Sequence, residues 1–130
     1  MQYLSAVSIL VEEYDSVISW FTRCLNFEVL VDQVVTEDMR FVRLAPSKDA
    51  SLSIVLNRVT GENAKYIGKQ AGDDVLMFLN TDDFDASYQD MLQQGVEFCE
   101  APRNEVYAKV VVFKDCLGNK WDLLEPTGLN

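Results

Sequence analysis

Short runs of β-branched and aromatic residues alternate along this chain with two segments of helical periodicity. In residues 14–25 and 82–94, apolar side chains recur three or four positions apart, the spacing of one face of an α-helix. Glycine, proline and asparagine separate the other apolar runs, as expected of strands joined by turns. The predicted strands span residues 3–11, 27–35, 39–45, 50–56, 74–80, 96–100, 107–115 and 120–125.

The predicted elements repeat. Each half of the chain has the order β-α-β-β-β, and Tyr14-Asp15 at the start of the first helix corresponds to Phe84-Asp85 in the second. Such an internal repeat indicates two copies of one supersecondary unit. We therefore predict an α+β fold of two βαβββ modules. The modules span about residues 1–57 and 74–130 of a single domain, 1–130, and a glycine-containing linker spans residues 58–73.

The last strands carry the most informative local pattern. Residues 107–126 predict a strand, a tight turn and a returning strand, with Gly118 and Asn119 in the turn as residues that tolerate a positive φ angle. Asp122 is a carboxylate within the returning strand, among apolar neighbours. An acidic residue at such a place is a candidate metal ligand.

Composition excludes several classes of protein. The chain has 21 acidic and 11 basic residues, a formal net charge of −10, so it lacks the basic face that nucleic-acid binding requires. No apolar run approaches the roughly 20 residues that span a bilayer. No basic region precedes an apolar stretch at the N-terminus, so we expect no secretory signal and a cytoplasmic location.

Two phrases carry a resemblance to a known family. The residues WFTRCLNF at 20–27 are similar to its helix motif, and FKDCLGNKWDLLE at 113–125 to its final hairpin. The chain thereby resembles the vicinal oxygen chelate superfamily of glyoxalases, extradiol dioxygenases and bleomycin-resistance proteins. Residues 67–73, 81–84 and 101–105 look like a bacterial branch of it. The resemblance implies a U-shaped mixed sheet around a ligand cleft, and a homodimer.

The metal site of the superfamily has no matching donor set in this chain. The resemblance places the family's ligand positions at Ala6, Val55, Leu76 and Asp122, and only Asp122 has a donor atom. The sequence contains no histidine, and one carboxylate does not make a three- or four-ligand site. We therefore expect a cleft without a metal or other cofactor.

Strand alternation predicts which side chains line the cleft. If Asp122 faces it, every second residue of the neighbouring strands does too. The predicted ligand-binding residues are Ser8, Phe41, Arg43, Val55, Leu76, Phe78, Tyr107, Asp122 and Leu124. Asp122 is also the one candidate catalytic residue, as a general base whose pKa burial would raise. The alternative interpretation pairs Asp122 with Arg43 or Lys120 in a structural ion pair.

Three classes of function remain. The first is a metal-independent protein that binds a small molecule, cationic or apolar, as the mostly apolar lining favours. The second is a lyase, isomerase or dioxygenase of the glyoxalase type with an atypical site, which rests on fold analogy. The third is an interaction module that works through its dimer surface. We rank them in this order and expect no nucleic-acid or membrane partner.

Overall fold

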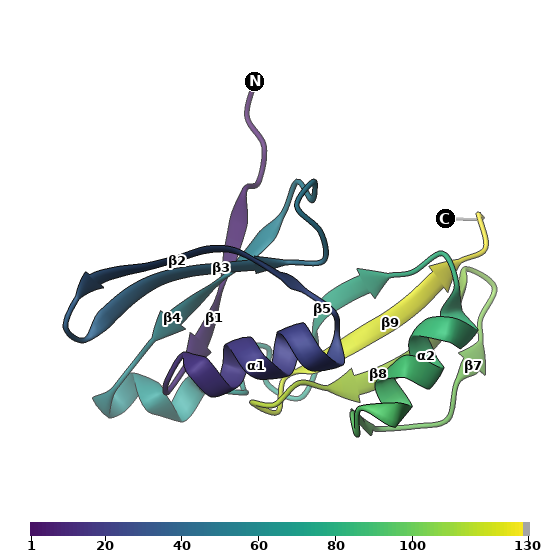
Figure 1. Ribbon diagram of the computed structural model, residues 1–130. Helices are drawn as coiled ribbons and strands as arrows, with labels where there is room; N and C mark the ends of the chain where they lie inside the picture. Colours follow the sequence, from purple (N-terminus) through teal and green to yellow (C-terminus); the bar gives the residue numbers. More distant parts are fainter. Residues whose placement is uncertain (129–130) are drawn as a thin grey trace. The chain divides into compact units, whose positions relative to one another are not determined.

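The computed structural model describes residues 1–128, and the chain forms two compact units (Figure 1). Unit 1 is Met1–Ile67, and unit 2 begins at Gly68. Among the described residues, each unit has one β-sheet and one α-helix. The predicted α+β class and the duplicated order of elements are therefore confirmed.

Unit 1 has the strand order β1-β4-β3-β2, with β1 parallel to β4 and the other neighbours antiparallel. The parallel pair brings the first and last strands of the module together at one side of the sheet. The elements are β1 (Ala6–Val11), α1 (Asp15–Cys24), β2 (Glu28–Thr36), β3 (Met39–Ala45), β4 (Ser53–Arg58) and the 3₁₀-helix η1 (Gly61–Tyr66).

Unit 2 repeats this plan with the order β5-β9-β8-β6, and β5 is parallel to β9. A further short strand, β7, pairs with β8 beyond β6. The elements are β5 (Val75–Asn80), α2 (Phe84–Gln93), β6 (Glu97–Phe98), β7 (Arg103–Asn104), β8 (Ala108–Lys114) and β9 (Lys120–Pro126).

Several predicted boundaries are wrong, and strand pairing explains them. The first strand begins at Ala6 rather than at residue 3, because its partner β4 begins at Ser53, opposite Ala6. β4 in turn continues to Arg58, which pairs with Val11. The strand predicted at residues 96–100 has only two residues. β7 and η1 lie in stretches that the sequence pattern assigned to a turn and to the linker.

Helix α1 begins with a side-chain cap from the residue before its N-cap. The carboxylate of Glu13 accepts hydrogen bonds from the backbone N–H of Asp15 and of Ser16, both at 3.0 Å, and from the Ser16 hydroxyl. These bonds satisfy donors that a helix N-terminus leaves free. Asn26 follows the helix with a φ of 56°, the left-handed conformation predicted for it.

Each unit buries the sheet face that its helix covers. In unit 1, Val17, Phe21 and Cys24 of α1 are buried together with alternate residues of three strands. Those strand residues are Ile9, Val11, Val42, Leu44, Ile54 and Leu56. In unit 2, a chain of aromatic contacts connects the helix to the sheet. It runs through Phe84, Tyr88, Phe98, Phe113 and Trp121.

The turn between β8 and β9 is organised by one buried carboxylate. Asp115 Oδ1 accepts from the backbone N–H of Leu117 at 2.9 Å and of Asn119 at 3.0 Å. Its Oδ2 accepts from Asn119 Nδ2 at 3.1 Å and from Trp121 Nε1 at 2.9 Å. Burial raises the pKa of Asp115, and these hydrogen bonds oppose that rise. Of the two residues predicted to tolerate a positive φ here, only Gly118 adopts one.

Replacing Asp115 by asparagine tests this turn. The amide offers one acceptor oxygen where four donors converge, and it places an N–H₂ group against some of them. We expect Asp115→Asn to lower the free energy of unfolding by about 2–4 kcal/mol, as for buried polar groups left without partners. Urea unfolding at neutral pH measures the change. The exposed Asp90→Asn is the control and should stay within about 0.5 kcal/mol of the parent protein.

Candidate binding surfaces on the two units

Strand register brings four predicted site residues of unit 1 onto one face. Ser8 of β1 pairs with Val55 of β4, and Val55 pairs with Arg43 of β3. Phe41 lies two residues along β3 from Arg43, on the same side of the strand. These residues alternate with the buried core residues, so they lie on the face opposite α1. In unit 1, the alternation of side chains predicted from the sequence therefore agrees with the observed burial of every second residue.

A hollow opens in this sheet where β3 and β4 stop pairing. Their register has only two pairs, Arg43 with Val55 and Leu44 with Ile54, and Figure 1 shows the two strands diverging beyond them. The hollow has a volume of about 380 Å³. Apolar and polar side chains of β1 to β4 and the start of α1 line it. They are Ser8, Tyr14, Val35, Met39, Arg40, Phe41, Val55, Leu56, Asn57 and Arg58.

Tyr14 replaces the missing strand partner at this place. Continuing the antiparallel register would bring Arg40 opposite Arg58. Instead, the backbone N–H of Arg40 donates to the hydroxyl of the buried Tyr14 at 3.3 Å. The Tyr14 ring also lies 5.2 Å from the Arg40 guanidinium carbon, within cation–π range. The aromatic side chain thus satisfies the backbone amide of Arg40 where β3 and β4 no longer pair.

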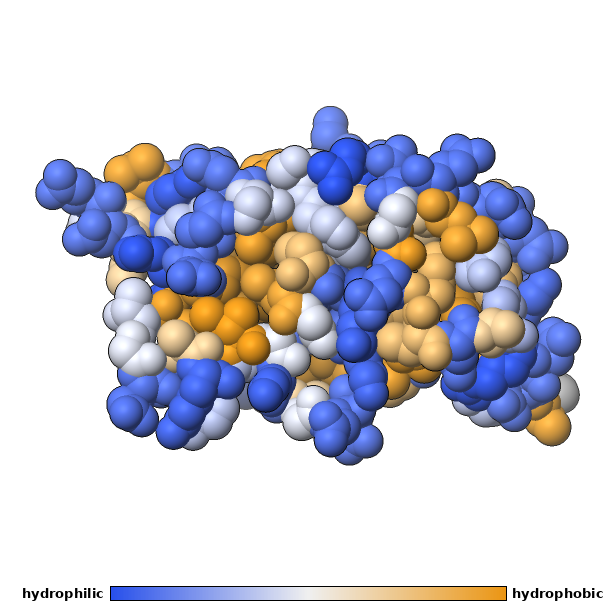
Figure 2. Space-filling view, turned by 90° about the horizontal axis from the view of Figure 1, so that it is seen from below, coloured by the Kyte–Doolittle hydropathy of each residue, from blue (hydrophilic) through white to orange (hydrophobic). Residues whose placement is uncertain are grey.

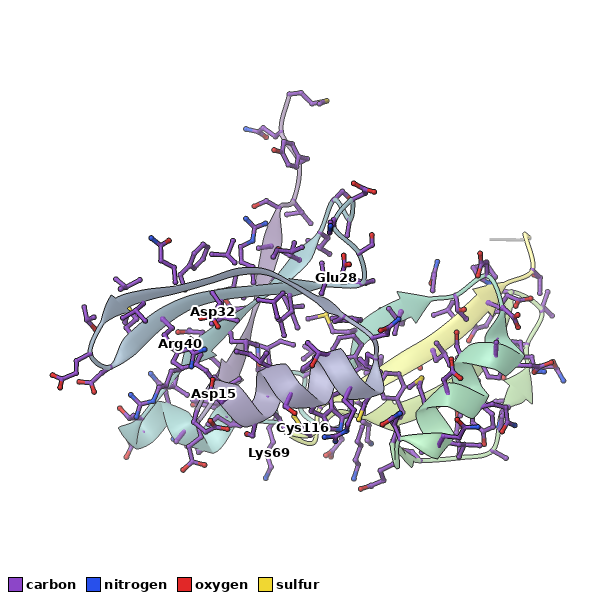
Figure 3. All side chains as sticks on the ribbon, in the orientation of Figure 1. Asp15, Glu28, Asp32, Arg40, Lys69 and Cys116 are labelled. Carbon is purple, nitrogen blue, oxygen red and sulfur yellow. The ribbon has the colours of Figure 1, made fainter. Side chains whose placement is uncertain are left out.

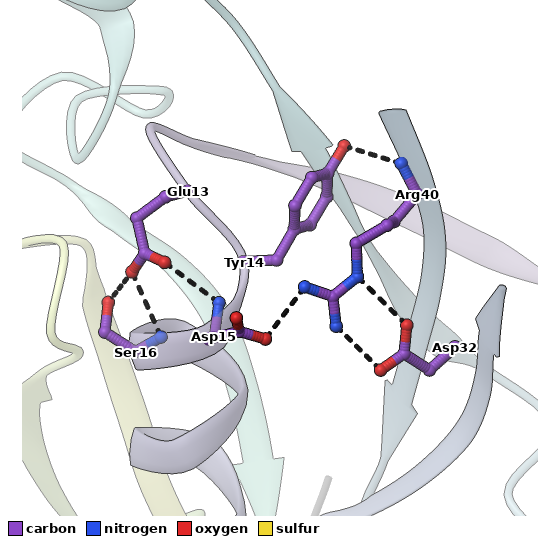
Figure 4. Close-up of polar contacts among 6 residues, drawn as sticks. All are labelled: Glu13, Tyr14, Asp15, Ser16, Asp32 and Arg40. Carbon is purple, nitrogen blue, oxygen red and sulfur yellow. Dashed lines mark hydrogen bonds and ion pairs between the residues drawn. The ribbon is translucent and has the colours of Figure 1, made fainter. Parts of the chain in front are cut away.

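Arg40 fixes the hairpin of β2 and β3 to the start of α1. Its Nε and Nη2 donate to the two carboxylate oxygens of Asp32 at 3.1 and 2.7 Å, and its Nη1 donates to Asp15 Oδ1 at 2.8 Å. Figures 3 and 4 show the guanidinium between the two acids. These hydrogen bonds raise the pKa of Arg40 above its ordinary value. The sequence pattern did not single out this network, because it joins three separate elements.

Arg43 is held differently. Its Nε donates to Ser53 Oγ at 2.9 Å and its Nη2 donates to the backbone oxygen of Ser5 at 3.3 Å. Arg43 lies in unit 1 and Asp122 in unit 2, so the ion pair between them that one interpretation gave stays a prediction. Ser53 is buried and also donates to Ser5, at 3.2 Å, so the three residues form a small network at the start of β1 and β4.

Of the predicted residues of unit 2, Phe78 and Leu124 lie beside Asp122 in the sheet, while Tyr107 precedes β8 at the other end of its pairing with β9. Asp122 of β9 pairs with Phe78 of β5 and with Val112 of β8, and Leu124 follows two residues along the same strand. Phe78 is 69% exposed and Tyr107 is 44% exposed. Leu76 lies at an irregularity of the β5 register, between Val75 and Met77, and has no strand partner in β9. Figure 2 shows one face of the molecule, on which apolar side chains gather in patches bordered by polar ones.

Asp122 is a buried carboxyl group without a hydrogen-bond partner for one of its oxygens. It is 9% exposed, and no described residue donates to its Oδ1. Desolvation raises the pKa of Asp122, the charge of Arg103 lowers it, and repulsion from Glu100 raises it. The alternative interpretation that pairs Asp122 with Lys120 is wrong. Lys120 Nζ instead donates to the backbone oxygen of Asp73 at 2.9 Å.

Arg103 is the basic residue near Asp122 that sequence reasoning missed as a site residue. It donates to both oxygens of Glu100, at 3.0 and 2.9 Å, and to Glu105 at 2.7 Å. Hydrogen bonds to Glu105, Glu100 and Tyr107 raise its pKa. Glu100 also accepts from the backbone N–H of Val112 at 3.0 Å, which ties the group to β8. The resemblance of residues 101–105 to a branch of the family was the signal in the sequence that could have identified Arg103.

The four family ligand positions do not provide a metal site. Ala6, Val55 and Leu76 have no donor atom, and the chain contains no histidine that a shift of register could bring to these positions. Within residues 1–128, no group of three or more histidine, cysteine, aspartate or glutamate side chains is placed to hold a metal ion. The residues present do not fit the metal of the superfamily.

The chain belongs to the glyoxalase/bleomycin resistance protein/dioxygenase superfamily, whose family model matches residues 3–123. An uncharacterized protein of Shewanella frigidimarina (strain NCIMB 400) is 36% identical over 126 residues, covering 95% of this chain and 93% of that protein. The crystal structure of UcmS2 is 26% identical, with a TM-score of 0.83 over 95% of this chain and 98% of UcmS2. TnmS3, an antibiotic-binding protein from Streptomyces sp. CB03234, has a TM-score of 0.79 at 24% identity, over 98% of each chain.

The raised pKa of Asp122 predicts a pH-dependent effect of Asp122→Asn. A carboxyl group whose pKa is raised by folding stabilises the folded state fully at low pH and loses that contribution as the pH rises through the folded-state value. We expect Asp122→Asn to be more stable than the parent at pH 7.5, by about 1 kcal/mol or more, and to lose this advantage near pH 4. Urea unfolding at both pH values measures it.

The exposed Asp74→Asn is the matched control, since it removes the same charge from the surface of the same unit. It should show no comparable difference between the two pH values. An Asp122→Asn protein that is less stable at pH 7.5 than at pH 4, relative to the parent, would show that the Arg103 charge dominates over desolvation.

Proposed function

We propose that this chain is a metal-independent protein that binds a small organic molecule. The hollow of about 380 Å³ between β3 and β4 carries the proposal, because three of the predicted ligand-binding residues, Ser8, Phe41 and Val55, line it. Its size is within the range of small-molecule pockets, about 300–1,000 Å³. The donor chemistry at the family's metal positions supports binding without a metal, since only Asp122 offers a ligand atom there.

The lining supports a ligand with an apolar body. Val35, Met39, Phe41 and Val55 present hydrocarbon surface, while Ser8 and Asn57 supply polar groups that can orient a ligand. A likeness in fold to TnmS3, whose description is an antibiotic-binding protein, is consistent with this class of ligand. On unit 2, the exposed Phe78 beside Asp122 offers a second apolar surface with one acidic group.

A glyoxalase-type lyase or isomerase is the second candidate. One observation favours it: the buried Asp122 has a raised pKa and an oxygen without a partner, two properties of a general base. This reaction class would have to proceed without the superfamily's metal. We rank it below binding for this reason.

The exposed side chains of β2 bear on whether the chain associates with a second copy of itself. β2 exposes Val29, Val34 and Val35, and such apolar edge strands commonly pair with another chain, so we propose a homodimer. No helix in the described part of the chain is long and apolar enough to cross a membrane. A cytoplasmic location remains our expectation from the sequence.

Native mass spectrometry of tag-free protein, compared with its denatured mass, tests the proposal first. We expect a dimer that carries no transition metal, either bare or with a small organic adduct lost on denaturation. One tightly bound transition metal per subunit would contradict the metal-independent class and move the enzyme to first place.

A larger side chain in the hollow should weaken ligand binding. Ser8 is exposed at its edge, so Ser8→Tyr adds a ring over Val55 without disturbing the core. Aromatic and aliphatic fragments are screened first by ligand-observed NMR, and the best binder is titrated. We expect at least a tenfold weaker affinity for Ser8→Tyr, and unchanged affinity for Ser19→Tyr on the exposed side of α1. A screen without any saturable binder at millimolar concentration would contradict the proposed function.

A further inference from the structure

The charge on the candidate face of unit 1 is opposite in sign to the charge of the whole chain. The chain has a formal net charge of −10. On the face opposite α1, strands β1, β3 and β4 present Arg43 and no acidic residue. The acidic residue of β2 on this side is Glu28, which pairs with Ala45 at the end of the sheet and forms no ion pair with Arg43. On the positions of β1, β3 and β4 that face away from α1, Arg43 is therefore the one charged side chain that a ligand meets.

Arg43 is oriented by neutral partners and keeps donors available. Its Nε and Nη2 donate to Ser53 Oγ and to the backbone oxygen of Ser5. A guanidinium has five N–H donors, and no described carboxylate lies within ion-pair distance of this one. Its side chain is half-buried beside Val55, so its orientation is fixed before any ligand arrives.

The other arginines of the two networks show the contrast. Arg40 is neutralised by Asp15 and Asp32, and Arg103 by Glu100 and Glu105. Arg58 at the end of β4 also has neutral partners, the backbone oxygens of Glu12 and Asp38, but it is exposed, whereas Arg43 is half-buried on the sheet face. Guanidinium groups bind carboxylates and phosphates through paired N–H donors, and this chemistry defines the ligand group that would complete Arg43.

We propose that Arg43 recognises an anionic group of the ligand, a carboxylate, sulfonate or phosphate, while the apolar body of the ligand lies over Val55 and Phe41 toward the hollow. This inference rests on the proposed function and adds the charge of the ligand to it. A charge-assisted hydrogen bond in a partly desolvated site gives about tenfold or more in affinity over an uncharged group.

Three naphthalene compounds with the same ring and different charge test the proposal. They are 2-naphthoate, 2-naphthalenemethanol and 2-naphthylmethylammonium, titrated by isothermal calorimetry at pH 7.5 and low ionic strength. We expect 2-naphthoate to bind at least tenfold more tightly than the alcohol, and the cation to bind most weakly. Added salt should weaken 2-naphthoate binding and leave the alcohol unchanged.

Substitutions assign the effect to Arg43. Arg43→Gln should remove the preference for 2-naphthoate and leave the affinity for the alcohol within about twofold, and Arg43→Lys should keep part of the preference. Arg23→Gln, an exposed arginine on α1, is the control for the loss of one positive charge. Glu28→Gln should strengthen 2-naphthoate binding slightly, since it removes the nearest acid on the face. If Arg43→Gln unfolds, Arg43→Lys and the alcohol affinity still separate charge recognition from structure.

The outcomes distinguish the two proposals. Equal affinity for all three compounds, or tightest binding of the cation, would overturn the inference about Arg43 and leave the small-molecule site intact. A preference for 2-naphthoate that persists in Arg43→Gln would place the anion elsewhere and also overturn it. Absence of binding by all three, together with no saturable binder in the fragment screen, would overturn the proposed function itself.

Discussion

The hydrogen bond from the Arg40 backbone to the Tyr14 hydroxyl is the constraint on which the candidate site of unit 1 depends. The register of β3 and β4 ends at Arg43 and Val55, and its continuation would bring Arg40 opposite Arg58. A backbone amide without a strand partner needs another acceptor, and a side chain from the start of α1 provides one. The hollow thus shares Tyr14 with the beginning of the helix, which the carboxylate of Glu13 caps.

The contacts of Arg40 with the start of α1 explain why the hairpin of β2 and β3 can extend beyond the rest of the sheet. β2 is exposed along most of its length and pairs only with β3, so it gains little from burial. Arg40 compensates by joining Asp32 of β2 to Asp15 of α1 through charge-assisted hydrogen bonds. Exposed ion pairs are individually weak, about 0–1 kcal/mol, but a bidentate arginine with two acids is the geometry in which they contribute most.

Much of the fold could be predicted from local signals, and much of the site could not. Helical periodicity, Asn26 and Gly118 are properties of neighbouring residues, so the helices and the last turn were predicted well. β7 escaped prediction because two residues after a proline carry no periodicity. Parity placed Ser8, Val55 and Arg43 on one face, but their partners depend on contacts far along the chain. Nothing local in the sequence indicates that Ser53 would accept a hydrogen bond from Arg43.

Arg43 and Asp122 show how the two modules depart from a common plan. Each lies on the sheet face opposite its helix, and neither forms an ion pair with a described residue. Burial of an ionisable group without a partner lowers stability, and residues that keep such a cost tend to serve a ligand. In Arg43 the cost is reduced by neutral hydrogen bonds that preserve the positive charge, whereas in Asp122 desolvation favours the uncharged acid. This difference suits Arg43 to an anion, whereas Asp122 keeps an oxygen to which no described residue donates.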